Sequence, residues 1–96
     1  MPAYVAVQVV INDPVTYERY KKLTPGSLES FGGRFLARGG ATEALEGTWK
    51  PQRFVLLEFP SVERARAWWN SPEYAEAKKL RQASASTEML LIEGAG

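Results

Sequence analysis

The stretch Gly32–Pro60, GGRFLARGGATEALEGTWKPQRFVLLEFP, decides the fold of this chain. It contains two glycine doublets and two strand-like runs, Arg34–Arg38 and Arg53–Phe59. Glycine doublets mark places where the backbone turns or is closely approached. Charges inside otherwise apolar strands need partners, because an unpaired buried charge is costly. The stretch therefore predicts two strands of one sheet, with polar side chains whose partners have to be found.

The connection between these two strands contains a second polar segment. Glu43–Gly47 is interpreted as either a short extra strand or a bulged extension, and Trp49–Pro51 as a loop. The doublet at Gly32 predicts a helix stop, and the doublet Gly39-Gly40 predicts a strand turn. Neither doublet has the spacing of a nucleotide-binding motif, so phosphate binding is not indicated.

Before this stretch, the sequence predicts one strand and one helix. Tyr4–Ile11 is rich in β-branched and apolar residues, as a strand covered on both faces would be. Asp13 followed by Pro14 is typical of a helix start, with a carboxylate cap and proline in the first turn. Pro25-Gly26 falls within the helix and is expected to kink or split it. The expected buried side of the helix carries Tyr17, Tyr20, Leu28 and Phe31.

After the stretch, two further helices and a last strand are predicted. Ser61 is expected to cap a helix whose apolar residues include Trp68 and Trp69. Ser71-Pro72 restarts the chain as another helix, which is expected to run through Gln82. Thr87–Glu93 is the predicted final strand.

The predicted order is βαββαβ, which is typical of an α+β ferredoxin-like fold with an antiparallel sheet and the helices on one face. Residues 1–96 are expected to form one domain. The first strand is apolar on both sides, with Val5 and Val7 on one and Tyr4 and Ala6 on the other. An uncovered apolar face favours a partner surface. Two such sheets packed face to face would form a dimeric α+β barrel, so a homodimer is predicted.

The composition excludes several classes of function. The chain of 96 residues has 12 basic and 11 acidic residues, a net charge of +1, and neither histidine nor cysteine. Thiolate chemistry and histidine-based catalysis or metal binding are therefore excluded, and no metal or cofactor is expected. The balanced charge favours no nucleic-acid partner. The N-terminus has no leader-like pattern and no apolar run long enough to span a membrane, so a cytoplasmic protein without a membrane partner is expected.

Five short motifs together resemble one family of small proteins, known as domain of unknown function 1330. They are DPxxYxxY from Asp13, GGRFLARGG at 32–40, LEGTW at 45–49, RxVxLEFP at 53–60, and SPEY at 71–74 with Arg81 downstream. The resemblance covers essentially the whole chain and implies a dimeric α+β barrel. It implies no particular reaction, because the wider superfamily includes cofactor-free monooxygenases, isomerases and haem-handling proteins.

Arg38, Glu58 and Gln8 are the first candidate site residues, because each interrupts an apolar strand. In one interpretation they form the polar floor of a pocket between sheet and helices, where Arg38 would bind an oxyanion. In the other, Arg38 and Glu58 pair with each other or point into water.

Aromatic and loop residues supply the remaining candidates. Tyr17, Tyr20 and Trp68 are interpreted either as the wall of that pocket or as core residues. Glu46, Trp49 and Arg53 lie in or beside the polar loop and would either cap the pocket or brace the dimer.

Two functions stay open at the level of sequence. The first is a cofactor-independent enzyme, an isomerase or monooxygenase-like protein acting on a small organic molecule. In it Glu58 or Glu46 would transfer protons, and Arg38 or Arg53 would stabilise an oxyanion. The alternative is a non-catalytic module that binds a small molecule or another protein.

Overall fold

Four strands and three α-helices follow one another in the predicted βαββαβ order. The computed structural model describes all 96 residues. The elements are β1 (Ala3–Ile11), α1 (Pro14–Leu28), the 3₁₀ turn η1 (Glu29–Phe31), β2 (Arg34–Arg38), β3 (Arg53–Phe59), α2 (Val62–Trp69), α3 (Pro72–Ser84) and β4 (Ala85–Glu93). The predicted ferredoxin-like arrangement is thereby confirmed.

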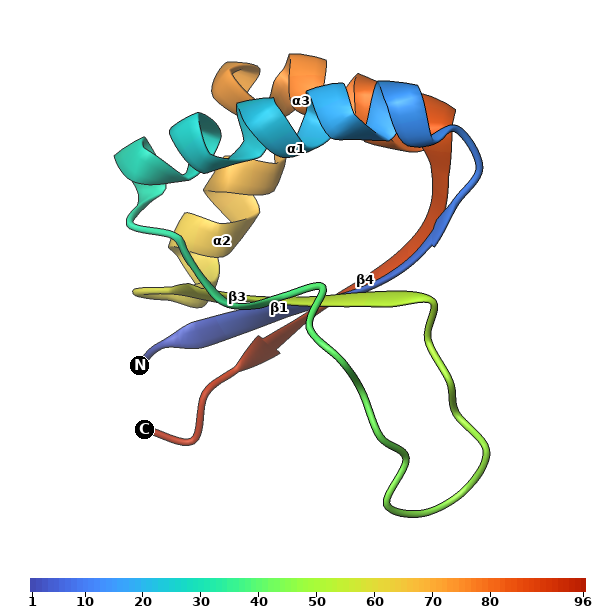
Figure 1. The fold of residues 1–96 in the computed structure, drawn as a ribbon. Coiled ribbons are helices and arrows are strands. Elements are labelled where there is room, and N and C mark those ends of the chain that lie inside the picture. Colours follow the sequence, from blue (N-terminus) through green and yellow to red (C-terminus); the bar gives the residue numbers. More distant parts are fainter.

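The strands form one antiparallel sheet in the order β2-β3-β1-β4. β1 lies inside the sheet and pairs with both β3 and β4, while β2 and β4 are the edges. All three helices cover the same face of this sheet, as predicted (Figure 1).

The two faces of the sheet differ sharply in burial. Along β1, Val5, Val7 and Val9 are buried beneath the helices, whereas the alternate residues point to the other side. We call that other side the open face. Its members, from the strand register, are Tyr4, Ala6, Gln8, Val10, Arg34, Ala37, Phe54, Leu56, Glu58, Ser86, Glu88, Leu90 and Ile92. Leu90 and Ile92 are 68% and 57% exposed, so the predicted apolar surface without a helix cover is present.

Aromatic residues fill the core between the helices and the sheet. Trp68 and Tyr74 are fully buried, and their ring centroids lie 4.0 Å apart. The Trp68 indole nitrogen donates a hydrogen bond to Ser27 Oγ at 3.0 Å, so its one polar atom is satisfied within the core.

The helices begin at the predicted caps. Asp13 Oδ1 accepts a hydrogen bond from the Thr16 amide at 3.2 Å, and its second oxygen accepts one from the Thr16 hydroxyl at 2.7 Å. These bonds lower the pKa of Asp13. Ser61 and Ser71 accept equivalent bonds at the starts of α2 and α3. Each cap supplies an acceptor for an amide that the helix itself leaves free.

Helix α1 is continuous through Pro25, so of the two predicted outcomes, a kink or a split, the split is wrong. Proline has no N–H, and the carbonyl of Lys21, four residues earlier, loses its usual donor. Arg38 replaces that donor, because its Nη2 donates to the Lys21 carbonyl oxygen at 2.6 Å. A side chain from β2 thus completes the hydrogen bonding of α1.

A bulge in β2 brings Arg38 to the helix side of the sheet. Phe35 pairs with Leu57 and Ala37 pairs with Leu56, so Leu36 is an extra residue between two register positions. Regular alternation from Phe35 would place Arg38 on the open face, but the extra residue reverses the side. The Arg38 guanidinium then stacks over Phe35, 4.3 Å from the ring centroid.

The connection between β2 and β3, residues 39–52, is an irregular loop. Glu43–Gly47 forms neither an extra strand nor a bulged extension. The loop leaves the sheet on the side opposite the helices (Figure 1), where no further strand is present to pair with it. Trp49 anchors it to the open face, because its indole nitrogen donates to Gln8 Oε1 and its ring packs against Phe54 with centroids 5.6 Å apart.

The pairing of Arg38 with the Lys21 carbonyl predicts coupling between positions 38 and 25. Arg38→Ala should lower the free energy of unfolding by about 1 kcal/mol, because the carbonyl loses its donor. In a Pro25→Ala background the new amide can bond to the same carbonyl, and Arg38→Ala should cost much less. Urea unfolding of the four proteins of this double-mutant cycle measures the difference. Equal costs in both backgrounds would contradict this explanation of the continuous helix.

The turn after β2 predicts that two adjacent glycines respond differently to alanine. Gly39 has φ +72°, and a Cβ there would clash with Nη1 of Arg53. Gly39→Ala should therefore destabilise the protein by about 1–3 kcal/mol. Gly40 has no atom within 4 Å of its Cβ position and serves as the matched control, with an expected change below about 0.5 kcal/mol. If thermal unfolding shows that Gly40→Ala is destabilised more than Gly39→Ala, the explanation that position 39 requires glycine is wrong.

Candidate functional site

The structure separates the site residues predicted from the sequence into two groups on opposite faces of the sheet. Tyr17, Tyr20, Arg38, Arg53 and Trp68 lie on the helix side. Gln8 and Glu58 lie on the open face, with Trp49 packed against it, and Glu46 is exposed in the loop that extends from it. The nine residues therefore do not meet in one site within a single chain.

The predicted pocket beneath Tyr17 and Tyr20 is nearly closed. The space there has a volume of about 20 Å³ and is lined by both tyrosines, Phe35, Arg38 and Arg53, among others. A space of this size accommodates one water molecule. No glutamate lines it, so the predicted combination of an arginine, a glutamate and an open pocket is not assembled here.

The two arginines of this closed region are held in different ways. Arg38 is bound to the Lys21 carbonyl, as described above. The guanidinium carbon of Arg53 lies 5.6 Å from the ring centroid of Tyr17, and Arg53 Nε is buried with no hydrogen-bond partner. Burial raises the pKa of Tyr17, and the nearby Arg53 charge opposes that shift.

On the open face, Glu58 pairs with Arg34 instead of Arg38. The distance from Arg34 Nη2 to Glu58 Oε1 is 2.6 Å, and Arg34 Nε donates to the same oxygen at 2.6 Å. The strand register is the reason, because Arg34 pairs directly with Glu58, whereas the bulge at Leu36 places Arg38 on the other face. Glu46 and Trp49 line a hollow of about 510 Å³ between the loop and Phe54.

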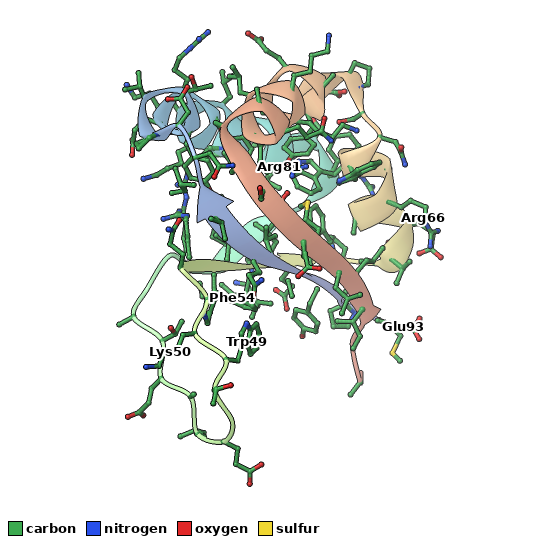
Figure 2. The ribbon with its side chains drawn as sticks, turned by 90° about the vertical axis from the view of Figure 1, so that its right-hand side faces the viewer. Trp49, Lys50, Phe54, Arg66, Arg81 and Glu93 are labelled. Atoms are coloured by element: carbon green, nitrogen blue, oxygen red, sulfur yellow. The ribbon has the colours of Figure 1, made fainter.

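A buried arginine on α3 is the functional candidate that the sequence reading did not assign. Arg81 is only 3% exposed, and Figure 2 shows it beneath the helices beside β4. Its Nε donates to the Tyr74 hydroxyl at 3.2 Å, and its Nη1 donates to Thr87 Oγ1. The ion pairs of the chain are Lys21 with Glu18 and Arg34 with Glu58, so no carboxylate neutralises Arg81.

Arg81 belongs to a buried chain of polar groups. The hydroxyl oxygens of Tyr74 and Tyr20 are 3.2 Å apart, which links Arg81 to α1 through two tyrosines. Burial is the main cause that raises the pKa of Tyr20, and Tyr74 adds to it. Tyr20 therefore stays protonated at neutral pH and can donate or accept a hydrogen bond.

Arg81 lies at one end of a cleft along the edge strand β4. One part of the cleft has a volume of about 470 Å³ and is lined by Trp69, Arg81, Gln82, Ala85, Thr87 and Met89. The neighbouring part has a volume of about 230 Å³ and is lined by Val5, Ala65, Arg66, Trp68, Trp69, Met89, Leu90 and Leu91. The two parts share Trp69 and Met89, and we call them together the β4 cleft. It is polar at Arg81 and apolar at the other end.

Trp69 stands between the two parts of the β4 cleft and is held by Lys78. The Lys78 ammonium lies 3.7 Å from the centroid of the indole ring and donates to the Trp69 carbonyl oxygen at 2.8 Å. These contacts fix the ring although the residue is 40% exposed.

One signal in the sequence could have revealed Arg81. The buried residues of α3 are Tyr74, Ala77, Arg81 and Ser84, a helical spacing that marks one face. A charged residue on an otherwise small or apolar buried stripe is a reason to look for a partner or a ligand.

Two further properties bear on the kind of site. No helix in the chain has the length and hydropathy needed to cross a membrane. No three acidic side chains gather closely enough to ligate a metal ion.

Solved structures share this fold at low sequence identity. A protein of unknown function from Rhodopseudomonas palustris, RPA0582, has a TM-score of 0.80 and 20% identity, over 99% of this chain and 83% of that chain. A dimeric ferredoxin-like protein of unknown function from Jannaschia sp. CCS1 has a TM-score of 0.73 and 14% identity, over 98% of this chain and 100% of that chain.

SnoaB, a cofactor-independent oxygenase from Streptomyces nogalater, is a further structural neighbour. It has a TM-score of 0.67 and 11% identity, over 99% of this chain and 94% of that chain. No curated protein matches the sequence significantly. At these identities the neighbours establish the fold alone.

A family comparison gives a more specific result. The family described as "Domain of unknown function (DUF1330)" matches residues 2–95, which is nearly the whole chain. The chain therefore belongs to the DUF1330 family.

Proposed function

We propose that the protein is a homodimer that binds a small organic molecule in the β4 cleft. The observation that carries this proposal is the size and lining of the cleft. Its larger part, at about 470 Å³, falls within the usual range for small-molecule sites, and the adjoining apolar part extends it. The space beneath Tyr17 and Tyr20, at about 20 Å³, is too small for such a ligand.

The open face supports the homodimer. Leu56, Leu90 and Ile92 lie on this face with no helix above them, and an exposed apolar surface of this kind favours a partner. A second copy of the chain is the proposed partner, because the structural neighbour from Jannaschia sp. CCS1 is described as dimeric. Packing two such faces together would give the dimeric α+β barrel.

Within this proposal the residues on the open face serve the interface. Gln8 and Trp49 hold the loop against the sheet, and Glu58 is neutralised by Arg34. A charged group that already has a partner can be covered by a second sheet at lower cost than a bare one. Glu46, in the exposed loop, would brace the partner copy.

A cofactor-independent enzyme, an isomerase or a monooxygenase-like protein, is the second candidate. The specific observation in its favour is the Tyr20–Tyr74 hydroxyl pair bonded to Arg81, which would orient that arginine to stabilise a negative charge developing on a bound molecule. The neighbour SnoaB is described as a cofactor-independent oxygenase. Conversion of a cleft ligand by the wild type, and its loss in Tyr74→Phe with binding retained, would favour this candidate.

The absence of nucleic-acid and membrane partners and a cytoplasmic location stay predictions from the sequence.

The cleft predicts that ligand binding depends on Trp69. In a thermal-shift screen of small organic molecules, ligands of the wild type should raise the melting temperature. Trp69→Ala should abolish that rise, because it removes the ring shared by both parts of the cleft. Leu23→Ala is the matched control, since Leu23 on α1 is 41% exposed and lines neither part. Ligands that stabilise Trp69→Ala as strongly as the wild type would place the site elsewhere.

The open face predicts that a single charge disrupts the dimer. Leu90→Lys places an ammonium group on the apolar surface of both copies, and the dimer dissociation constant should rise by roughly a hundredfold or more. Val15→Lys is the control, because Val15 is 77% exposed on α1, away from the open face. Analytical ultracentrifugation measures both variants. A wild type that sediments as a monomer at micromolar concentration would overturn the dimer.

A further inference from the structure

Arg81 is a buried positive charge with no negative charge of its own chain beside it. It is 3% exposed, and neither ion pair of the chain includes it. A guanidinium group stays charged in proteins, and removing it from water without a counter-charge is costly. A fold that keeps such a group has either a structural use for its hydrogen bonds or an anion that comes from outside.

The hydrogen bonds of Arg81 leave part of the guanidinium free. Nε is bound to the Tyr74 hydroxyl and Nη1 to the Thr87 hydroxyl, and both acceptors are neutral. Nη2 makes no hydrogen bond within the chain. It is not sealed from solvent either, because Arg53 Nε is the only buried side-chain polar atom that lacks a partner. Arg81 lines the larger part of the β4 cleft, so we infer that its free donors are approached from there.

The two bonded hydroxyls also fix the orientation of the group. Tyr74 is fully buried, and its hydroxyl is next to that of Tyr20. Thr87 comes from the neighbouring strand β4. A guanidinium group held on two sides is preorganised, so an arriving anion does not have to order it.

The lining of the cleft has the charge that an anion requires. Neither part contains an aspartate or a glutamate, and the only ionisable residues are Arg81 at one end and Arg66 at the other. Between them lie Trp69, Met89 and Leu91, which offer apolar surface. A fitting ligand thus combines one oxyanion with an apolar body.

We propose that the β4 cleft binds an organic monocarboxylate, with its carboxylate on Arg81 and its apolar body between Trp69 and Met89. A carboxylate matches the planar donor group of arginine and would supply the missing negative charge. This inference rests on the proposed function and narrows it from a small organic molecule to a class of ligand.

Matched pairs of acids and amides test the charge requirement. The probes are hexanoate with hexanamide, benzoate with benzamide and phenylacetate with phenylacetamide, and inorganic phosphate is added as an anion without an apolar body. Calorimetric titration at constant ionic strength should show that the wild type binds at least one acid tenfold or more tightly than its amide. Arg81→Met should lower the affinity for that acid by roughly tenfold to a hundredfold and leave the affinity for its amide unchanged.

Two further variants keep the test decisive if Arg81→Met does not fold. Thr87→Val removes one of the hydroxyls that hold the guanidinium and nearly preserves the shape of the side chain. It should therefore lower the affinity for acids more than the affinity for amides. Arg66→Met is the control for loss of a positive charge, because Arg66 lies at the apolar end and is exposed. It should retain the preference for acids.

The other outcomes each overturn the inference in a distinct way. Equal affinity for acid and amide would remove the role of Arg81 and leave the cleft as a site for neutral molecules. Phosphate binding as tight as that of the acids would show that the site accepts oxyanions in general and has no preference for carboxylates. No binding by any pair would also refute the inference. The proposal that the β4 cleft binds a small organic molecule falls only if the broad screen finds no ligand that depends on Trp69.

Discussion

The core, the open face and the β4 cleft all follow from one constraint: the three helices cover a single face of a four-stranded sheet. The helices enclose the valines of β1, Trp68 and Tyr74 in a core on that side. The other face keeps Leu90 and Ile92 exposed, as no element of the same chain covers them. The β4 cleft has the same origin, because β4 is an edge strand, and Trp69 at the end of α2 stands beside it without sealing it.

Much of this fold can be predicted from the sequence, because the signals involved are local. Asp13-Pro14, Ser61 and Ser71 mark helix starts through side-chain acceptors that sit next to the amides they bind. The apolar strands and the order of elements lead to the ferredoxin-like topology. The split at Pro25 fails as a prediction, since the replacement donor comes from Arg38, which is distant in sequence.

The site is less predictable, because it depends on register and on contacts between elements. The register places Arg34 opposite Glu58, and a single extra residue, Leu36, decides that Arg38 lies on the helix side of the sheet. No pattern in the sequence of β2 predicts that bulge. The helical spacing of α3 places Arg81 on the buried stripe, but its lack of an acidic partner appears only when α3 is packed against β4. Composition did restrict the chemistry, since it removed histidine and cysteine from consideration.

The contact between Arg38 and the Lys21 carbonyl also constrains how this protein can evolve. Lys21 contributes only a main-chain oxygen, so its side chain is free to change without loss of the contact. The residues at positions 25 and 38 depend on each other, because a residue with an amide hydrogen at position 25 would compete with Arg38 for the Lys21 oxygen. A homologue without the proline would not need the arginine for this contact. The two positions, one in a helix and one in a strand, should therefore covary although their side chains need never touch.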